Sequence, residues 1–138
     1  MTDLNIIENQ ISQTEKYLKL LIYYQKLPRE KLESDPHLRG GLERYLYLVT
    51  QSAIDLSEAI IAHKKLRKPT TMAESFEILA EEEIVDHKLA EKLTRMVGFR
   101  NIIAHNYTEL DYKIVFDVLH HRLRDIKEFL QSVQSVLQ

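Results

Sequence analysis

Apolar residues recur along most of this chain at steps of three and four, the period that places them on one face of an α-helix. The clearest stripe lies in the middle of the sequence and consists of Leu42, Leu46, Val49, Ala53, Leu56 and Ile60. A second stripe ends the chain and consists of Val115, Leu119, Ile126, Phe129, Val133 and Leu137. The pattern predicts an all-α protein.

Breaks that contain proline divide the pattern, because proline and the residue before it resist the continuation of a helix. They are Leu27-Pro28, Ser34-Asp35-Pro36 and Lys68-Pro69-Thr70-Thr71. We expect helices at about 4–25, 29–33, 36–66 and 72–80, one from Asp86 toward residue 100, and one at about 111–137. Four long helices with short connections predict an antiparallel bundle of four to five helices.

A few polar and flexible positions refine this prediction. Asp35 and Asp86 stand where an N-cap is needed, because a carboxylate there accepts hydrogen bonds from the first free N–H groups of a helix. Thr14 interrupts the apolar stripe of the first helix. Gly40-Gly41 could bend the long helix that begins near Pro36.

Length and composition limit the class of protein. The chain of 138 residues predicts one domain, spanning 1–138. It has no cysteine, which leaves out disulfides and thiolate zinc sites and suits a cytoplasmic location. The first residues lack a signal-peptide pattern, and no apolar stretch approaches the roughly 20 residues of a membrane span. We therefore expect no membrane attachment.

The net charge of −2 argues against a general nucleic-acid binder, which is usually basic. Any contact with RNA must then depend on a local cluster. The one dense basic run, His63-Lys64-Lys65-Leu66-Arg67-Lys68, could hold an RNA backbone. It equally suits the negative C-terminal end of a helix, and this second interpretation needs no ligand.

Three side chains suited to phosphate chemistry lie within one short segment: Arg100, His105 and Tyr107. The guanidinium of arginine matches phosphate oxygens, and histidine, with a free pKa of about 6.5, transfers protons near neutral pH. Metal-independent RNA cleavage needs a base for the ribose 2′-hydroxyl, a cation for the phosphorane and an acid for the leaving oxygen. The same residues could instead simply close the end of a helix.

Helical geometry does not bring Arg100 and His105 together. At about 100° per residue they point roughly 140° apart, so either the helix breaks before His105 or a second chain completes the site. Asn101 lies four residues before His105 and could orient its imidazole. Asp55, within an apolar segment, could orient His105 or Arg100, or could lie on the polar edge of its helix.

Metal and cofactor sites have little support in the sequence. It contains none of the zinc-protease, calcium-loop or glycine-rich phosphate-loop motifs. The adjacent His120 and His121 point about 100° apart on a helix, so they do not form a chelating pair. We therefore expect no metal site and no cofactor.

The segment Arg100-Asn101-Ile102-Ile103-Ala104-His105-Asn106-Tyr107 resembles the motif of HEPN-domain ribonucleases, and its His-x-Tyr ending is similar to that of the HepT-like toxins. The resemblance extends over most of the chain, through its length, the order of its helices and the segments 53–56 and 76–80.

The resemblance implies a homodimeric endoribonuclease toxin in which Arg100 and His105 are catalytic and paired motifs face each other across the dimer. From their positions, we expect Asn101 and Asp55 to support these two residues. It also implies a partner, a minimal nucleotidyltransferase antitoxin that transfers AMP to Tyr107. An alternative is a non-catalytic helper or nucleotide-binding subunit of a nucleotidyltransferase, and a further one is a plain dimeric interaction bundle.

Overall fold

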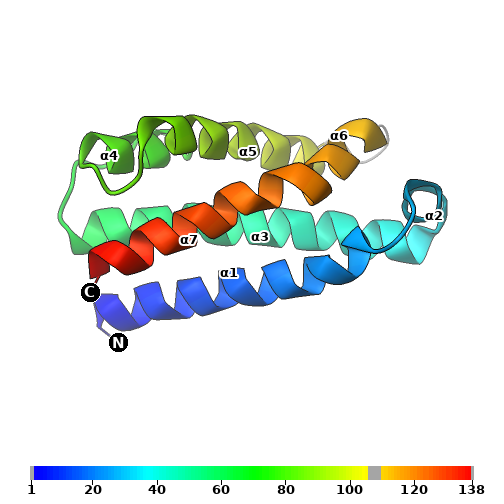
Figure 1. Cartoon of the computed structure of the whole chain (residues 1–138). Coiled ribbons are helices and arrows are strands. Elements are labelled where there is room, and N and C mark those ends of the chain that lie inside the picture. Colours follow the sequence, from blue (N-terminus) through cyan, green and yellow to red (C-terminus); the bar gives the residue numbers. More distant parts are fainter. Residues whose placement is uncertain (1, 106–109, 138) are drawn as a thin grey trace.

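The computed structural model describes residues 2–105 and 110–137. The four long helical runs are α1 (Asp3–Gln25), α3 (Pro36–His63), α5 (His87–His105) and a C-terminal run that ends in α7 (Leu123–Leu137). They alternate in direction and place both termini at the same end of the molecule (Figure 1). The short helices α2 (Arg29–Ser34) and α4 (Glu74–Glu81) lie in the connections. The predicted all-α antiparallel bundle is confirmed.

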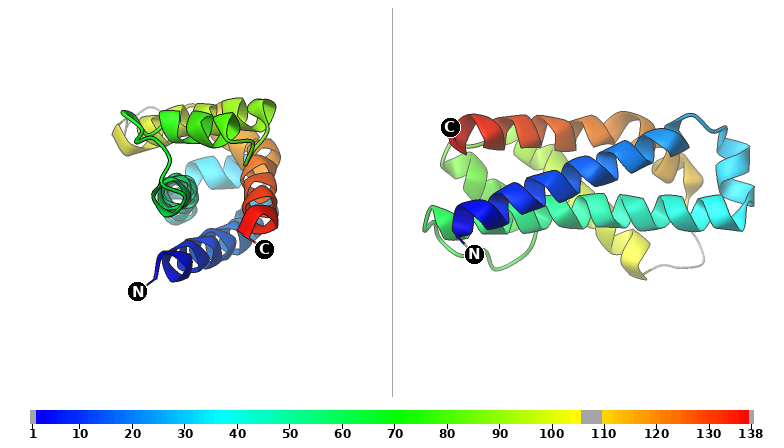
Figure 2. Two further views of the ribbon diagram at one scale, coloured as in Figure 1. Left: turned by 90° about the vertical axis from the view of Figure 1, so that its left-hand side faces the viewer. Right: turned by 90° about the horizontal axis from the view of Figure 1, so that it is seen from below.

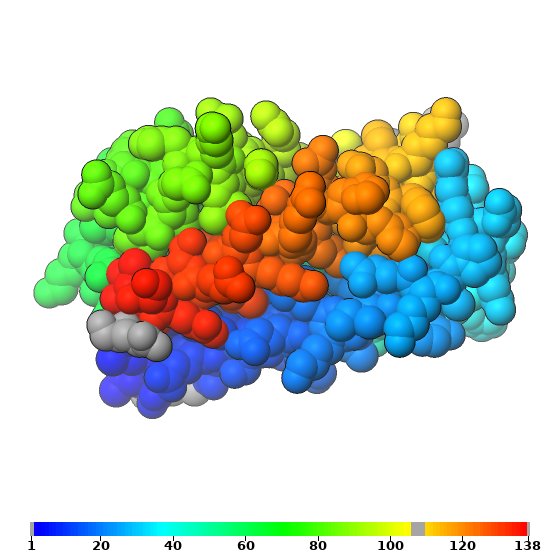
Figure 3. All heavy atoms as spheres, viewed as in Figure 1, coloured from blue at the N-terminus to red at the C-terminus, as the bar shows by residue number. Residues whose placement is uncertain are grey.

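The end-on view shows how the long helices enclose the core (Figure 2). α3 lies between α1 and α5, and α7 closes the other side, where it runs across the face between α1 and α5 (Figure 3). All six members of the central stripe, from Leu42 to Ile60, are buried. In the described part of the chain, no helix is both long enough and apolar enough to cross a membrane.

The two expected N-caps form. Asp35 Oδ1 accepts hydrogen bonds from the backbone N–H groups of His37 and Leu38, at 2.9 and 3.3 Å. Asp86 Oδ1 accepts one from the N–H of Leu89 at 2.8 Å. Because these caps are local, the sequence alone could identify them.

Two polar details of the bundle have packing reasons. Thr14 is fully buried, and its hydroxyl pairs with that of Ser52 across α1 and α3 at 2.9 Å, so the break in the stripe is hydrogen-bonded. α3 continues through Gly40-Gly41. A Cβ on Gly41 would clash with the Tyr24 hydroxyl, so the glycine permits the close approach of α1 to α3.

α3 ends at His63, three residues before the expected Leu66. Lys65 has the left-handed φ of 55°, and the N–H of Leu66 donates to the carbonyl of Ile61 at 3.0 Å. α4 ends in the same way: Glu83 has a φ of 58°, and the N–H of Ile84 donates a hydrogen bond to the carbonyl of Leu79 at 2.9 Å. Each is a Schellman C-cap that uses a charged residue where glycine is usual, so no glycine marks these helix ends in the sequence.

The C-terminal run is not the single α-helix that we expected over 111–137. It consists of α6 (Tyr112–Asp117), a π-helical turn (Val118–Arg122) and α7. The wider turn changes the backbone pairing, and Gln25 Nε2 donates to the carbonyl of Leu119 at 2.9 Å. A π turn keeps the apolar period nearly unchanged, so the sequence pattern could not reveal it.

Candidate active site

A groove between α3 and the last turns of α5 lies beside Arg100, one of the residues that the sequence singled out. Its cavity of about 360 Å³ is lined by Glu43, Arg44 and Tyr47 of α3 and by Ile103 and Ala104 of α5. Arg100 lies along the same pair of helices and contacts Tyr47. The groove therefore gives a ligand access to the neighbourhood of the Arg100 guanidinium.

Three hydrogen bonds hold the Arg100 guanidinium in place. Its Nε donates to Gln51 Oε1 at 2.8 Å, Nη1 donates to Asn101 Oδ1 at 2.9 Å, and Nη2 donates to the Tyr47 hydroxyl at 3.0 Å. The carbon centre of the guanidinium also lies 4.9 Å from the centroid of the Tyr47 ring. All of these partners are neutral, so the positive charge is oriented without being neutralised.

Asp55 reaches this group indirectly. Its Oδ1 accepts a hydrogen bond from Gln51 Nε2 at 2.9 Å, which fixes the Gln51 amide with its oxygen toward Arg100. Only that amide orientation satisfies both neighbours. Asp55 thus orients Arg100 through Gln51, and among the described residues it makes no direct hydrogen bond to Arg100 or His105.

Asn101 does not have the role that its spacing predicted. Its side-chain oxygen accepts from Arg100, and within the described chain no hydrogen bond joins it to His105. The expectation relied on the four-residue helical spacing, which brings two side chains to one face but does not exclude a nearer donor. Arg100 is adjacent in sequence and carries five N–H donors.

His105 is the last residue of α5 and is exposed. The helix includes it, so the expected alternative of a break before His105 is wrong. Arg100 contacts α3, and five residues later on a helix a side chain points about 140° away, so His105 is not expected on the same side of α5. Tyr107, the expected site of modification, lies outside the described residues, as do Asn106 and Thr108.

The sequence analysis missed three residues of this region: Tyr47 and Arg44, which line the groove, and Gln51, which binds Arg100. Arg44 lies over the same Tyr47 ring as Arg100, with 5.7 Å from its guanidinium carbon to the ring centroid. A signal was present in the sequence. Polar residues occupy every fourth position of α3, and we call this set the polar ladder: Arg39, Glu43, Tyr47, Gln51 and Asp55.

Arg39 and Glu43, the first two residues of the polar ladder, connect the groove to α6. Tyr112 donates a short hydrogen bond to Glu43, which also pairs with Arg39 at 3.0 Å. The Arg39 guanidinium lies 4.7 Å from the centroid of the Tyr112 ring. Burial, and then the bond to Glu43, raises the pKa of the Tyr112 phenol. The phenol therefore stays protonated and holds α6 against α3 beside the groove.

The basic run at 63–68 is far from this groove. Gln51 and His63 are twelve residues apart on α3, or about 18 Å along the axis. Arg67 is already engaged, because it pairs with Glu74 and with Glu81, the latter at 2.7 Å. The interpretation of this run as a helix end is therefore better supported than a role in holding RNA.

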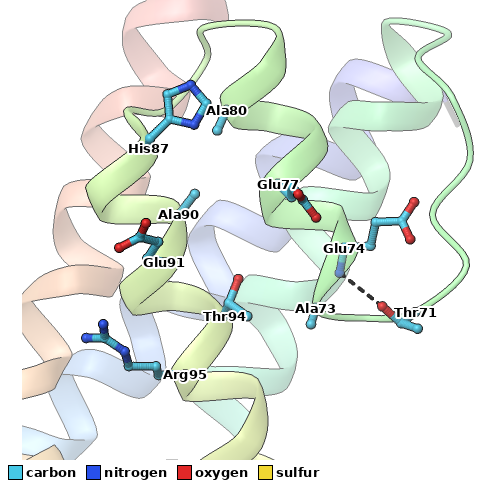
Figure 4. Close-up of a pocket in the computed structure, with 10 residues that line it drawn as sticks. All are labelled: Thr71, Ala73, Glu74, Glu77, Ala80, His87, Ala90, Glu91, Thr94 and Arg95. Atoms are coloured by element: carbon cyan, nitrogen blue, oxygen red, sulfur yellow. Dashed lines mark hydrogen bonds between the residues drawn. The ribbon is translucent and has the colours of Figure 1, made fainter.

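Another cavity, of about 560 Å³, lies between α4 and α5, and its lining does not include Arg100. Its lining includes Glu74 and Glu77 of α4 and Glu91 and Arg95 of α5 (Figure 4). Three carboxylates at its wall would repel a phosphate backbone, so we do not place RNA there. The described residues include no group of three side chains placed to bind a metal ion.

Comparison with known proteins gives a consistent result. The family model described as Ribonuclease HepT-like matches residues 7–133. The chain is 28% identical to the mRNA nuclease HepT of Shewanella oneidensis, over 95% of this chain and 98% of that one. It is also 28% identical to the tRNA nuclease HepT of Aphanizomenon flos-aquae, over 96% of this chain and 90% of that one.

Solved structures show the same likeness. A toxin–antitoxin complex with AMP-PNP contains a chain with a TM-score of 0.87 and 27% identity, over 95% of this chain and 98% of that one. The tri-AMPylated Shewanella oneidensis HEPN toxin, in complex with the MNT antitoxin, has a TM-score of 0.86 and 28% identity, over 98% of this chain and 99% of that one.

Proposed function

The chain belongs to the ribonuclease HepT-like family, and we propose that it is a metal-independent endoribonuclease toxin of the cytoplasm that a nucleotidyltransferase antitoxin neutralises. The family match and the nuclease activity named for its relatives support the reaction class. The neutral hydrogen-bond partners of Arg100 support its assignment to the active site.

The observation that carries the proposal is the set of neutral acceptors around Arg100. A guanidinium has five N–H donors, and here three of them are hydrogen-bonded, to Gln51, Asn101 and Tyr47. Among the described residues, the other two donors, one on each Nη atom, have no partner. They present a positive fork of fixed orientation, which matches two oxygens of a phosphate. An arginine with a purely structural role would more commonly face a carboxylate.

In the proposed reaction, His105 removes the proton from a ribose 2′-hydroxyl, and the 2′-oxygen attacks the adjacent phosphorus. Arg100 stabilises the negative charge of the phosphorane. The bond from phosphorus to the 5′-oxygen breaks, and a protonated imidazole donates a proton to that oxygen. The products are a 2′,3′-cyclic phosphate and a 5′-hydroxyl. One P–O bond forms and one breaks, and no oxidation state changes.

A second copy of the chain completes the site in this proposal. Because α5 includes His105, one copy directs Arg100 and His105 to different sides of the helix. Two copies related by a two-fold axis would bring two Arg100 forks and two imidazoles together, one as base and one as acid. Light scattering should then give the mass of two chains; the mass of one chain at micromolar concentration would contradict a shared site.

The decisive experiment is RNA cleavage in the presence of EDTA. Wild type should cleave, and His105→Ala should be about 100-fold slower or worse, the usual effect of losing a general acid–base group. His87→Ala, at the other end of α5, is the matched control and should cleave normally. RNA binding without cleavage would favour the non-catalytic helper alternative.

Neutralisation is proposed to act through Tyr107. A related toxin is solved in tri-AMPylated form with its MNT antitoxin. Each AMP added beside Arg100 brings bulk and a phosphodiester charge that would compete with RNA. Incubation with the cognate nucleotidyltransferase and ATP should add AMP units to wild type, as measured by intact mass. Tyr107→Phe should stay unlabelled and active; equal labelling of both would place the acceptor elsewhere.

A further inference from the structure

A second cavity lies on another side of α5, against the C-terminal run. It has a volume of about 160 Å³, and the two elements that form it adjoin on the face shown in Figure 3. Met96 and Phe99 of α5 and Val118 of the π turn give it buried apolar walls, and the half-exposed Ile114 of α6 lies at its edge. This volume is below the roughly 300 Å³ of a pocket for a drug-sized ligand, so it suits a single ring system.

Asp125 of α7 is the unusual member of this cavity. Its side chain is 1% exposed, and within the described structure its Oδ2 has no hydrogen-bond partner. An unpaired buried carboxylate is costly, and such groups are normally hydrogen-bonded. Burial raises the pKa of Asp125, although Lys92, Arg122 and Arg124 oppose the rise. Among the described residues, no donor reaches this oxygen.

Cations complete the lining. Lys92 and Arg95 of α5 and Arg122 of the π turn all border the cavity, and Arg122 also lies 3.4 Å from Asp117. Asp117 also lines the cavity and pairs with Arg122, so Lys92 and Arg95 are the cations that oppose a cationic ligand such as an amine, even though Asp125 would attract one. They favour a ligand that joins a neutral ring with N–H donors to a negative phosphate.

We propose that this cavity is a nucleobase pocket that prefers guanine, with the base between the apolar walls, Asp125 accepting from its Watson–Crick edge, and the phosphate near Lys92 and Arg95. Guanine presents two adjacent N–H donors on that edge, which a carboxylate can accept together. Single-stranded RNA is read through such edges and through packing of the base against side chains.

The π turn helps to build the pocket. Val118 and Arg122 are its first and last residues, and both line the cavity. π turns within helices occur frequently at functional sites. The pocket is separate from the Arg100 groove, although Phe99 and Arg100 are adjacent on α5, because successive residues of a helix point about 100° apart.

The test compares two nucleotides that differ by one donor. GMP and IMP have the same phosphate and ring system, but IMP lacks the 2-amino group. By calorimetry, GMP should bind about tenfold more tightly than IMP, the usual scale for one base-edge contact. Asp125→Asn should remove this preference. Glu8→Gln removes the same charge from the exposed side of α1 and should keep it.

Stability provides a second readout. Asp125→Asn replaces an unpaired buried charge by a neutral group, so the ligand-free variant should unfold at the same temperature as wild type or higher. If this variant does not fold, Ile114→Trp gives an independent test. Ile114 is 48% exposed at the cavity, so a larger ring there should block binding without disturbing the core.

The base could come from a free nucleotide or from RNA, and a competition experiment on the His105→Ala variant separates the two. Displacement of GMP by a guanosine-containing tetranucleotide indicates RNA; binding of GMP without displacement indicates a free nucleotide. Equal affinity for GMP and IMP, binding of neither at millimolar concentration, or a preference that persists in Asp125→Asn would overturn the proposal. Nucleotide binding does not depend on cleavage, so an inactive enzyme would leave this test intact.

Discussion

Arg100 and Arg67 are both held by several hydrogen bonds, but their partners differ in charge. Arg67, just beyond the end of α3, faces two carboxylates: Glu74 and Glu81, with 2.7 Å between Nη2 and Glu81 Oε1. Arg100 faces the amide oxygens of Gln51 and Asn101 and a tyrosine hydroxyl. Arg67 is neutralised, whereas Arg100 keeps its charge.

The difference separates a structural arginine from one that is ready for a ligand. The Arg67 group joins the connection after α3 to α4 and needs nothing further. It is exposed, so its contribution to stability is small. The Arg100 group fixes the direction of a positive charge without cancelling it, which is what a phosphate site requires. Counting hydrogen bonds alone would not distinguish the two.

The largest effect should come from changing each arginine to lysine. Arg100→Lys keeps the charge but loses the fork and the contact with Tyr47, so we expect RNA cleavage to fall about 100-fold or more. Arg67→Lys should cleave like wild type. Both variants should keep the helical circular dichroism spectrum. Full activity in Arg100→Lys would show that orientation of the charge is unimportant.

A smaller effect should follow when Arg100 is given a carboxylate as hydrogen-bond partner, as Arg67 has. Gln51→Glu, made together with Asp55→Asn so that two carboxylates do not face each other, places a carboxylate against the guanidinium with almost no change in shape. It should lower cleavage by about tenfold or more, because the neutralised charge attracts phosphate less strongly. Gln131→Glu, on the exposed side of α7 and also made together with Asp55→Asn, adds the same charge elsewhere and is the control. Equal activity in the two double variants would mean that the neutral partners of Arg100 have no role.

Asp55 should matter less, because it acts through Gln51. Asp55→Ala removes the acceptor that orients the Gln51 amide, and loss of one such bond should reduce cleavage by up to about tenfold. Asp55→Asn retains an oxygen that can accept the same hydrogen bond, so it should be nearer to wild type. If the two variants lost equal activity, the charge of Asp55 rather than its hydrogen bond would be responsible.

The smallest effect concerns acid stability at Arg67. The hydrogen bond from Arg67 lowers the pKa of Glu81, and the bonds from Thr70 and Arg67 lower that of Glu74, both from 4.5. A lowered pKa stabilises the folded state at pH values above 4.5, and this stabilisation is lost as the pH falls through the lowered values. Arg67→Gln should therefore melt slightly below wild type at pH 7, and the two melting temperatures should converge toward pH 3. A constant difference would exclude this ion pair as the cause.

Local sequence patterns determined most of the fold. The apolar stripes, the proline breaks and the Asp35 and Asp86 caps each act within a few residues, so the helices and their antiparallel order could be predicted. The exceptions were also local. Lys65 and Glu83 end helices in a left-handed conformation that sequence rarely signals in charged residues, and a π turn replaces one turn of the expected C-terminal helix.

The candidate site needed the tertiary structure. Arg100, Asn101 and Asp55 were identified from the sequence, but the partners that orient Arg100 lie 49 and 53 residues earlier, on α3. Helical spacing could pair Asn101 with His105, yet only packing of α5 against α3 decided that Asn101 would serve Arg100. Likewise, burial of Asp125 depends on how α7 lies against α5. A sequence specifies which groups are present and on which face of a helix they lie, whereas the packing between distant helices decides which charges are neutralised and which remain available.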